Sequence, residues 1–109
     1  MNVFFICGRN RRRSPTAEEI FADYPGVETA SAGVSADADE PVTADVLEWA
    51  QLIVVMENSH RGKLNAKFSS HLRDKRIACI NVPDKYEYMD ARLIELLKER
   101  VPPLLTRSR

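Results

Sequence analysis

The sequence has 109 residues, of which 44% are hydrophobic, and its 16 basic side chains equal its 16 acidic ones in number. This length predicts a single domain over residues 1–109, because independent domains seldom fall much below about 50 residues. A net charge of zero gives no general attraction to nucleic acid or to an anionic membrane, so any electrostatic function has to be local.

The N-terminal residues MNVFFICG are apolar over only a few positions and lack a preceding basic segment, so they do not resemble a secretion signal. No apolar run approaches the roughly 18 residues that a membrane helix needs. The two cysteines, Cys7 and Cys79, are therefore expected to be free thiols in a reducing cytoplasm.

The predicted elements alternate between short apolar runs, typical of strands buried on both faces, and longer amphipathic patterns, typical of helices. Beginning with a strand, they are expected at Val3 to Ile6, Pro15 to Asp23, Val27 to Ser31, Thr43 to Ala50, Ile53 to Met56, His60 to Leu72, Ile77 to Val82 and Asp90 to Val101. The alternation predicts an α/β fold: a small four-stranded parallel sheet with helices on both faces, because parallel neighbours need long crossing connections. Binding sites in such sheets lie beyond the carboxyl ends of the strands.

Two segments are expected to lie outside this framework. Gly33 to Val42 contains small and acidic residues and a proline, which predicts a surface loop whose acids Asp37, Asp39 and Glu40 are solvated. The final residues, PPLLTRSR, are expected to close the last helix and to fray.

The first predicted strand ends at Cys7, and four arginines follow in the stretch CGRNRRRSPTAEE. Arg13 comes after five intervening residues, and Ser14 and Pro15 suit the N-cap and first position of a helix. Glu18 and Glu19 are expected to place negative charge in its first turn. The strand therefore leads through a short, strongly basic loop into a helix N-terminus.

A loop at this position points backbone N–H groups inward, which together with the helix dipole makes a nest for a tetrahedral oxyanion. The same field favours the thiolate form of a cysteine, and a guanidinium offers two parallel hydrogen bonds to phosphate oxygens. The sequence therefore predicts a phosphate-binding loop between the first strand and the first helix. In it, Cys7 accepts a phosphoryl group and Arg13 holds the anion.

These residues resemble a known family. VFFICGRNRRRSPTAEEIF is similar to the signature of low-molecular-weight protein tyrosine phosphatases, in which a strand leads into a cysteine, five residues and Arg-Ser-Pro. The stretches SAG from Ser31, WAQLIVVMENSH from Trp49 and VPDKY from Val82 agree in the same order. The resemblance spans most of the chain and implies a phosphatase that uses a phosphocysteine intermediate.

The resemblance also implies roles for single residues. Cys7 is the expected nucleophile, Arg13 is expected to stabilise the transition state, and Asp84 is the expected general acid. The residues expected to bind the phosphate group are Gly8, Arg9, Asn10, Arg11, Arg12 and Ser14. Ser14 is expected to donate a hydrogen bond to the thiolate, Asn10 and Ser31 to brace the loop, and Tyr86 to flank the substrate ring. Neither a metal nor another cofactor is expected, because Arg13 and backbone N–H groups supply the positive field.

Several residues have alternative interpretations. Asp84 follows a proline and is also compatible with an ordinary turn, and Asp90 is the rival acid, although an N-cap role explains it more simply. Cys79 is expected to be a small buried hydrophobe. His60 and His71 lack a metal-binding spacing and are expected to be surface or capping residues.

The sequence also departs from the family pattern. It is shorter than typical members, and Lys85 replaces the usual proline after Asp84. Positions 9, 11 and 12 are commonly small, apolar or a second cysteine in the family, whereas here all three are arginine. These arginines form either a solvated basic rim or a recognition patch that favours a more anionic substrate than phosphotyrosine alone.

Three functions are compatible with this pattern. The leading one is a cysteine-dependent phosphatase that acts on aryl phosphates, with phosphotyrosine proteins as the expected partners. The alternatives are an arsenate reductase on the same fold, which needs further cysteines, and a non-catalytic anion-binding module. Nucleic acid is not an expected partner, because the chain is neutral and has no exposed aromatics interleaved with its basic residues.

Overall fold

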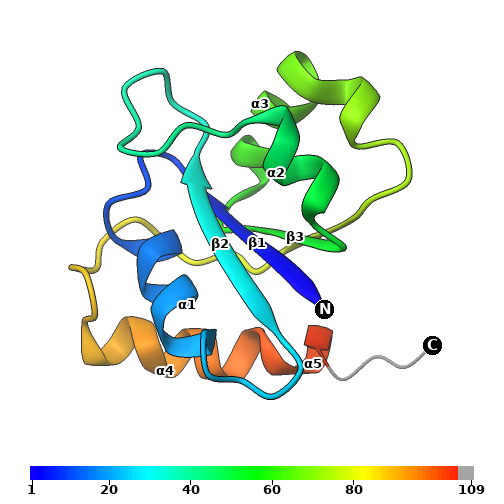
Figure 1. The fold of residues 1–109 in the computed structure, drawn as a ribbon. Helices are drawn as coiled ribbons and strands as arrows, with labels where there is room; N and C mark the ends of the chain where they lie inside the picture. The colour runs from blue at the N-terminus through cyan, green and yellow to red at the C-terminus, as the bar shows by residue number, and fades with distance from the viewer. Residues whose placement is uncertain (106–109) are drawn as a thin grey trace.

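The computed structural model describes residues 1–105 and contains four strands, five α-helices and one short 3₁₀ turn within them. In chain order the elements are β1 (Asn2–Cys7), α1 (Arg13–Phe21), β2 (Glu28–Gly33), α2 (Ala44–Trp49), β3 (Leu52–Val55), α3 (Asn58–Phe68), η1 (Ser69–His71), β4 (Arg76–Cys79), α4 (Ala91–Arg100) and α5 (Pro102–Leu105). Figure 1 shows the strands at the centre and the helices around them. None of the described helices is long and apolar enough to cross a bilayer.

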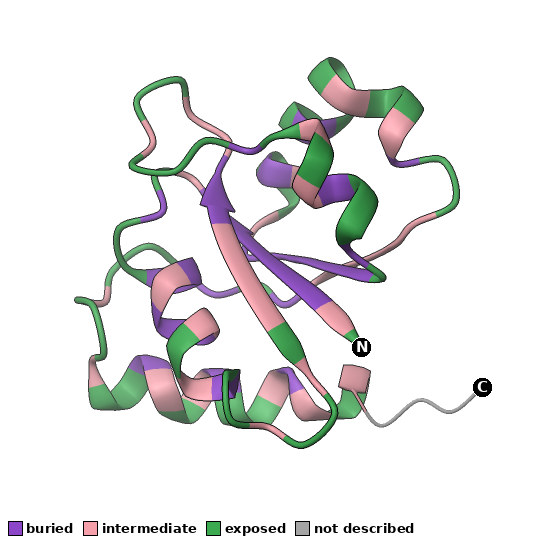
Figure 2. Ribbon diagram, viewed as in Figure 1, coloured by how far each residue is buried: buried purple, intermediate pink, exposed green. Residues whose placement is uncertain are grey.

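All strand pairings are parallel, and the strand order is β2-β1-β3-β4. The central strands β1 and β3 consist of residues that are almost all buried, which explains why their sequences are apolar at successive positions (Figure 2). The structure therefore confirms the predicted α/β class, the four-stranded parallel sheet and the loop between its first strand and first helix.

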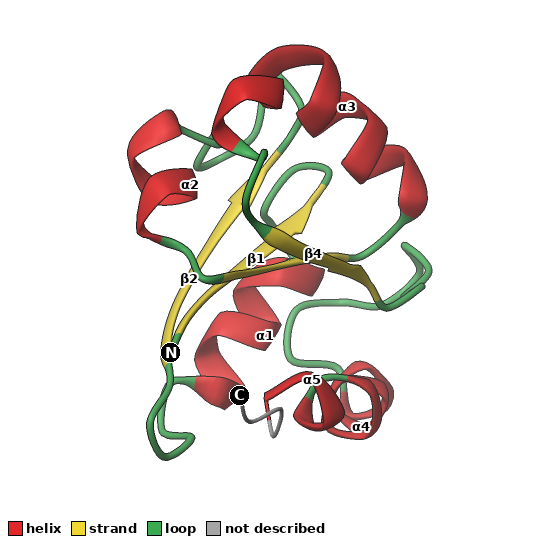
Figure 3. Ribbon diagram, turned by 90° about the vertical axis from the view of Figure 1, so that its right-hand side faces the viewer, coloured by secondary structure: helices red, strands yellow, loops and turns green. Residues whose placement is uncertain are grey.

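The sheet separates two apolar clusters, and helices cover both faces (Figure 3). On one face Phe5 and Val54 pack with residues of α1 and α4, such as Phe21 and Leu97. On the other face the residues that pack together include Phe4, Ile53, Leu47 and Leu64 from β1, β3, α2 and α3. The central strands β1 and β3 therefore contribute alternate side chains to each layer.

Several boundaries differ from those predicted. β4 ends at Cys79, not at Val82, because Asn81 adopts a left-handed backbone with φ of 54° and bends the chain away from an extended path. The predicted helix to Leu72 is α-helical only to Phe68 and ends in η1. Pro102–Leu105 forms one helical turn where fraying was expected, and the rest of that predicted tail lies outside the described residues.

Candidate active site

The loop after β1 curls around the Cys7 sulfur. Asn10 has φ of 58°, a left-handed conformation that asparagine tolerates better than most residues, and it is buried. This turn directs the Asn10 backbone N–H at Cys7 Sγ, with an N···S distance of 3.2 Å. The loop thus supplies a hydrogen-bond donor to the sulfur, as expected for a nest that holds negative charge.

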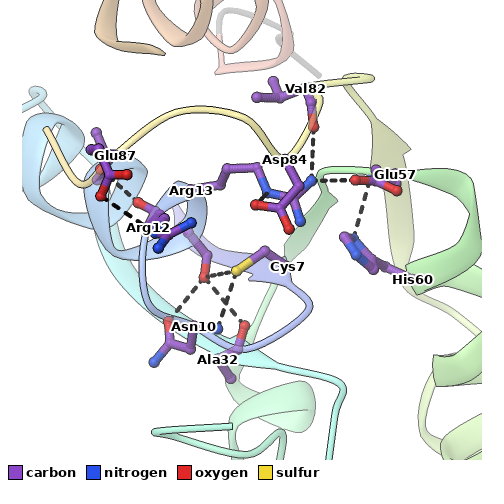
Figure 4. Close-up of polar contacts among 12 residues, drawn as sticks. Cys7, Asn10, Arg12, Arg13, Ala32, Glu57, His60, Val82, Asp84 and Glu87 are labelled. Atoms are coloured by element: carbon purple, nitrogen blue, oxygen red, sulfur yellow. Dashed lines mark hydrogen bonds and ion pairs between the residues drawn. The ribbon is translucent and has the colours of Figure 1, made fainter. Parts of the chain in front are cut away.

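Figure 4 shows Cys7 and Asn10 close together at this loop, and the buried Ser14 contacts both of them. Its Oγ is 2.9 Å from Cys7 Sγ and 2.9 Å from Asn10 Oδ1. A hydroxyl has a single hydrogen to donate, so it can donate to only one of these two atoms at a time. When Cys7 is a thiolate it is a pure acceptor, and the Ser14 hydrogen then belongs on the sulfur.

The start of α1 differs from the prediction. The helix begins at Arg13 with Arg12 at the N-cap, so Ser14 is inside the first turn and is not the N-cap. Glu18 and Glu19 are correspondingly beyond the first turn, which contains no acidic residue. Ser14 is fully buried, and its hydroxyl contacts the loop rather than the helix end.

The end of β2 and the segment after it support the loop through backbone contacts. Val34 N donates to Cys7 O at 3.0 Å, and Ser35 N donates to Gly8 O at 2.9 Å. Gly33 is pressed against the loop, because a Cβ built on it would lie 2.5 Å from Gly8 O. Ser31 was expected to brace the loop; in the structure its hydroxyl donates to Glu18 Oε1 in the middle of α1.

Arg13 is buried and held by acceptors from two other segments. Its Nη1 donates to Glu57 Oε2 and to Val82 O, the latter at 2.8 Å, and its Nε lies 3.7 Å from Asp84 Oδ1. Its side chain is only 5% exposed, so the two carboxylates compensate a charge that burial would otherwise disfavour. The hydrogen bonds of this guanidinium to the described residues use Nη1, and none of them uses Nη2.

Sequence reasoning missed Glu57, which follows β3 and is the N-cap of α3. Glu57 and His60 form a capping box, in which the Glu57 side chain accepts from the His60 backbone and His60 Nδ1 accepts from Glu57 N at 3.2 Å. His60 is the capping residue that the sequence predicted, but it is buried rather than on the surface. Burial, followed by the nearby Arg13 charge, lowers the pKa of His60 below its usual value.

These groups line a cavity of about 420 Å³ at the carboxyl end of the sheet. Its lining residues come from the segments after all four strands and are Cys7, Gly8, Arg9, Arg11, Arg12, Arg13, Ser35, Glu57, Ser59, His60, Lys63 and Asp84. Asn10 and Ser14 are absent from the lining, and both are buried.

Two further predictions for the loop after β4 have different outcomes. Tyr86 was expected to flank the substrate, but it is not among the described residues that line the cavity and packs against the apolar cluster under α1 and α4. Asp84 does line the cavity, whereas Asp90 caps α4 by accepting from Arg92 N at 2.8 Å. Of the two rival acids, only Asp84 therefore lies at the cavity.

The other three loop arginines are paired with acids. The distances between the closest charged atoms are 3.7 Å for Arg9 and Asp37, 3.2 Å for Arg11 and Asp39, and 3.6 Å for Arg12 and Glu87. The acidic loop after β2 is exposed as expected, but two of its carboxylates face the basic loop rather than solvent alone. The excess of positive charge in the sequence motif is thus balanced in three dimensions.

The two cysteines lie on different faces of the sheet. Cys7 belongs to the apolar cluster that contacts α1 and α4, and Cys79 packs against the other cluster. β3 lies between their strands, so their backbones are separated by two strand spacings, about 9.5 Å in total. A disulfide tolerates a Cα separation of only about 7 Å. Cys79 is also only partly buried, and its thiol donates to Asn81 Oδ1.

Comparisons with known proteins place this arrangement in a structural context. No protein-family model matches the sequence, and no curated protein matches it significantly. Solved structures do match. The low-molecular-weight protein tyrosine phosphatase SP-PTP from Streptococcus pyogenes has a TM-score of 0.79 and 18% identity, over 99% of this chain and 93% of that one.

Two other matched structures carry further information. The YwlE arginine phosphatase from Geobacillus stearothermophilus has a TM-score of 0.70 and 18% identity, over 99% of this chain and 98% of that one. The tyrosine phosphatase Wzb from Escherichia coli K30, solved in complex with phosphate, has a TM-score of 0.68 and 22% identity, over 91% of both chains. The resemblance predicted from the sequence is therefore confirmed as a shared fold across nearly the whole chain.

Proposed function

We propose that this protein is a cysteine-dependent phosphatase that hydrolyses a phosphorylated protein side chain through a phosphocysteine intermediate. The observation that carries the proposal is the joint position of Cys7 and Arg13. The sulfur accepts from a loop N–H and contacts the Ser14 hydroxyl, while the buried guanidinium lines the same cavity and its Nη2 makes no hydrogen bond within residues 1–105. The shared fold with tyrosine and arginine phosphatases, one of them solved with phosphate, supports this assignment.

In the first step the Cys7 thiolate attacks phosphorus, and the bond between phosphorus and the leaving atom breaks. Arg13 and the loop N–H groups stabilise the negative charge on the phosphoryl oxygens. Asp84, protonated, gives its proton to the leaving atom. Its side chain is 61% exposed and its contact with Arg13 is long, so it has the freedom to turn toward a substrate.

In the second step the phosphocysteine is hydrolysed. Asp84 is now ionised and takes a proton from water, whose oxygen attacks phosphorus. The S–P bond breaks, which regenerates the Cys7 thiolate and releases inorganic phosphate. Ser14 stabilises the thiolate as a leaving group by donating its hydroxyl hydrogen to the sulfur, 2.9 Å away.

The first candidate substrate is an aryl phosphate, with phosphotyrosine proteins as the physiological class. A second candidate is phosphoarginine, which the shared fold with an arginine phosphatase supports. Among the described residues, no Phe, Tyr or Trp lines the cavity, and Tyr86 packs elsewhere. The described cavity lining therefore offers no Phe, Tyr or Trp ring on which an aryl group could stack.

Hydrolysis of a chromogenic aryl phosphate by wild type and by Cys7→Ser tests the proposed chemistry. We expect turnover in the wild type and none above background in the variant, because a serine hydroxyl is a far weaker nucleophile than a thiolate. Equal rates in the two proteins would contradict the proposal. Phosphotyrosine and phosphoarginine versions of one peptide then decide between the substrates by their kcat/KM ratio.

The general acid is tested by leaving-group dependence. Asp84→Asn should slow turnover of a poor leaving group by about 10²-fold or more and affect a good leaving group far less. Asp90→Asn is the matched control, because Asp90 serves as a helix cap. A larger effect at Asp90 than at Asp84 would reverse the assignment.

Arsenate reduction through a Cys7–Cys79 disulfide is disfavoured by the separation of the two thiols on opposite faces of the sheet. A purely anion-binding function predicts phosphate binding without turnover. Titration with inorganic phosphate beside the turnover assay therefore separates a binding module from an enzyme.

A further inference from the structure

His60 is a buried polar residue at the cavity to which the proposed mechanism gives no role. It lies in the first turn of α3, it is 5% exposed, and its ring lines the same cavity as Cys7 and Arg13. A histidine that is this buried needs hydrogen-bond partners for both ring nitrogens, because an unpaired polar atom in the interior is costly.

Nδ1 is already engaged within the capping box. It lies 3.2 Å from the backbone N of Glu57, and a backbone N–H can only donate. Nδ1 must therefore accept, which requires that it carries no proton. In the neutral ring the single proton is then on Nε2. The lowered pKa of His60, caused first by burial and then by the Arg13 charge, agrees with a neutral ring.

Nε2 faces the phosphate-binding loop. Gly8 is the residue after the nucleophile, and a Cβ placed on it would lie 3.9 Å from His60 Nε2. Apart from Gly8 and its chain neighbours, no other atom would lie within 4 Å of that Cβ. No hydrogen bond within residues 1–105 uses Nε2. Although Nε2 makes no hydrogen bond to these residues, they do not enclose it fully. A ligand can therefore reach it from the cavity.

From this geometry we infer that His60 is an anion-binding residue: its neutral Nε2–H donates a hydrogen bond to an oxygen of a phosphate group bound over Cys7. Glu57 links this donor to Arg13, because its backbone N–H fixes the His60 ring and its carboxylate accepts from the Arg13 guanidinium. The inference depends on the proposed function only in that the cavity binds phosphate.

The charges around His60 favour this protonation state. Arg13 and Lys63 face it from α1 and α3 and disfavour a second proton on the ring, whereas Glu57 and Asp84 favour one. A second proton, on Nδ1, would also point at the Glu57 N–H, so Nδ1 could no longer accept from it and the capping box would break. The neutral donor is therefore the form that keeps both the helix cap and the loop intact.

Two substitutions separate the two nitrogens of the ring. His60→Asn places an amide group near the Nδ1 position, so it can still accept from Glu57 N but has no donor that reaches the cavity. His60→Gln places its amide nitrogen near the Nε2 position, so it keeps the cavity donor and loses the cap acceptor. The measurement is the Kd of inorganic phosphate, determined by calorimetric titration near neutral pH.

We expect His60→Asn to weaken phosphate binding by about tenfold to a hundredfold, the usual value of a hydrogen bond to a charged group. His60→Gln should retain most of the wild-type affinity and be the less stable of the two proteins. A structural role alone predicts the opposite order, because the Asn variant preserves the helix cap. Equal phosphate affinity in wild type and His60→Asn, or no rescue by Gln, would overturn the inference.

Nitrogen NMR of the imidazole ring gives a second test that does not depend on substitution. We expect the spectrum at neutral pH to identify the Nε2–H tautomer, and the Nε2–H signal to shift on addition of inorganic phosphate. An Nδ1–H tautomer, or an Nε2–H signal that does not change on addition of phosphate, would also overturn the inference.

Phosphate binding and turnover together distinguish this inference from the proposed function. If the wild type binds phosphate without turnover, the enzymatic proposal fails and the role of His60 stands. If it binds no phosphate, both fail.

Discussion

The burial of Arg13 is the central energetic feature of the site at the scale of single residues. Cys7 and Arg13 were predicted from their spacing because they belong to one continuous loop. Glu57 was missed because it is 44 positions from Arg13 and only the pairing of β1 with β3 brings the two together. A local pattern identifies the residues that bind an anion, but not the distant carboxylate that stabilises their charge.

Glu57→Ala should therefore lower both stability and phosphate affinity. We expect a loss of about 2 kcal/mol in the free energy of unfolding, less than the 3–5 kcal/mol of a fully buried pair because Glu57 is 39% exposed. Denaturant unfolding measures the loss. Glu57→Gln keeps an acceptor for Arg13 and for the helix cap, so it should recover part of the stability. Identical stability in wild type and Glu57→Ala would show that Arg13 does not need this carboxylate.

His60 should make stability depend on pH. Its pKa is lowered in the folded protein from the ordinary value of 6.5, so the unfolded chain binds the proton more readily. The contribution to stability is fully present above about pH 6.5 and is lost as the pH falls below it, with a slope of at most about 1.4 kcal/mol per pH unit. Unfolding curves of wild type and His60→Asn should diverge in this range, and parallel curves would contradict the prediction.

At the scale of secondary structure, the elements were predictable because each strand and helix carries its own local signal. The apolar runs of β1 and β3 and the spacing of α4 identified these elements within about two residues. The directions of side chains near element ends could not be predicted in the same way. Ser31 points at Glu18, and Tyr86 packs under the sheet, because register and loop path decide which way a side chain faces.

The contact between β2 and the loop after β1 should make Gly33 intolerant of a side chain. Gly33→Ala would place a Cβ within 2.9 Å of backbone atoms of Gly8 and Arg9, which cannot move without opening the loop. We expect a loss of stability of about 1–3 kcal/mol together with weaker phosphate binding. Gly62→Ala is the matched control, because a Cβ there meets nothing within 4 Å and alanine favours a helix, so stability should rise by up to about 1 kcal/mol. Similar outcomes for the two variants would refute this account.

At the scale of the whole molecule, charge is balanced locally as well as in total. The net charge is zero, and the exposed arginines beside the cavity are each within 4 Å of a carboxylate from another loop. Composition could not predict this balance, because it depends on the acidic loop after β2 folding against the basic one. The expectation that three extra arginines favour a more anionic substrate is weakened accordingly.

Removal of the rim carboxylates should therefore strengthen the attraction for anions. The double variant Asp37→Asn with Asp39→Asn should raise kcat/KM for a phosphopeptide several-fold at low salt, and the gain should shrink near 0.15 M salt, where screening acts over about 8 Å. Stability should change by less than about 1 kcal/mol, because the pairs are exposed. Glu95→Gln with Glu99→Gln makes the same charge change on α4, outside the cavity lining, and should have little effect. Equal gains from both double variants would mean that only total charge matters.

The placement of the two cysteines on opposite faces has a consequence for oxidative damage. A thiolate that is oxidised to a sulfenic acid is usually rescued when a nearby thiol condenses with it to form a disulfide. The only other thiol in this chain lies across β3 on the far side of the sheet, so Cys7 has no such partner within its own fold. After oxidation, recovery of Cys7 depends on a small thiol that enters through the same cavity as the phosphate.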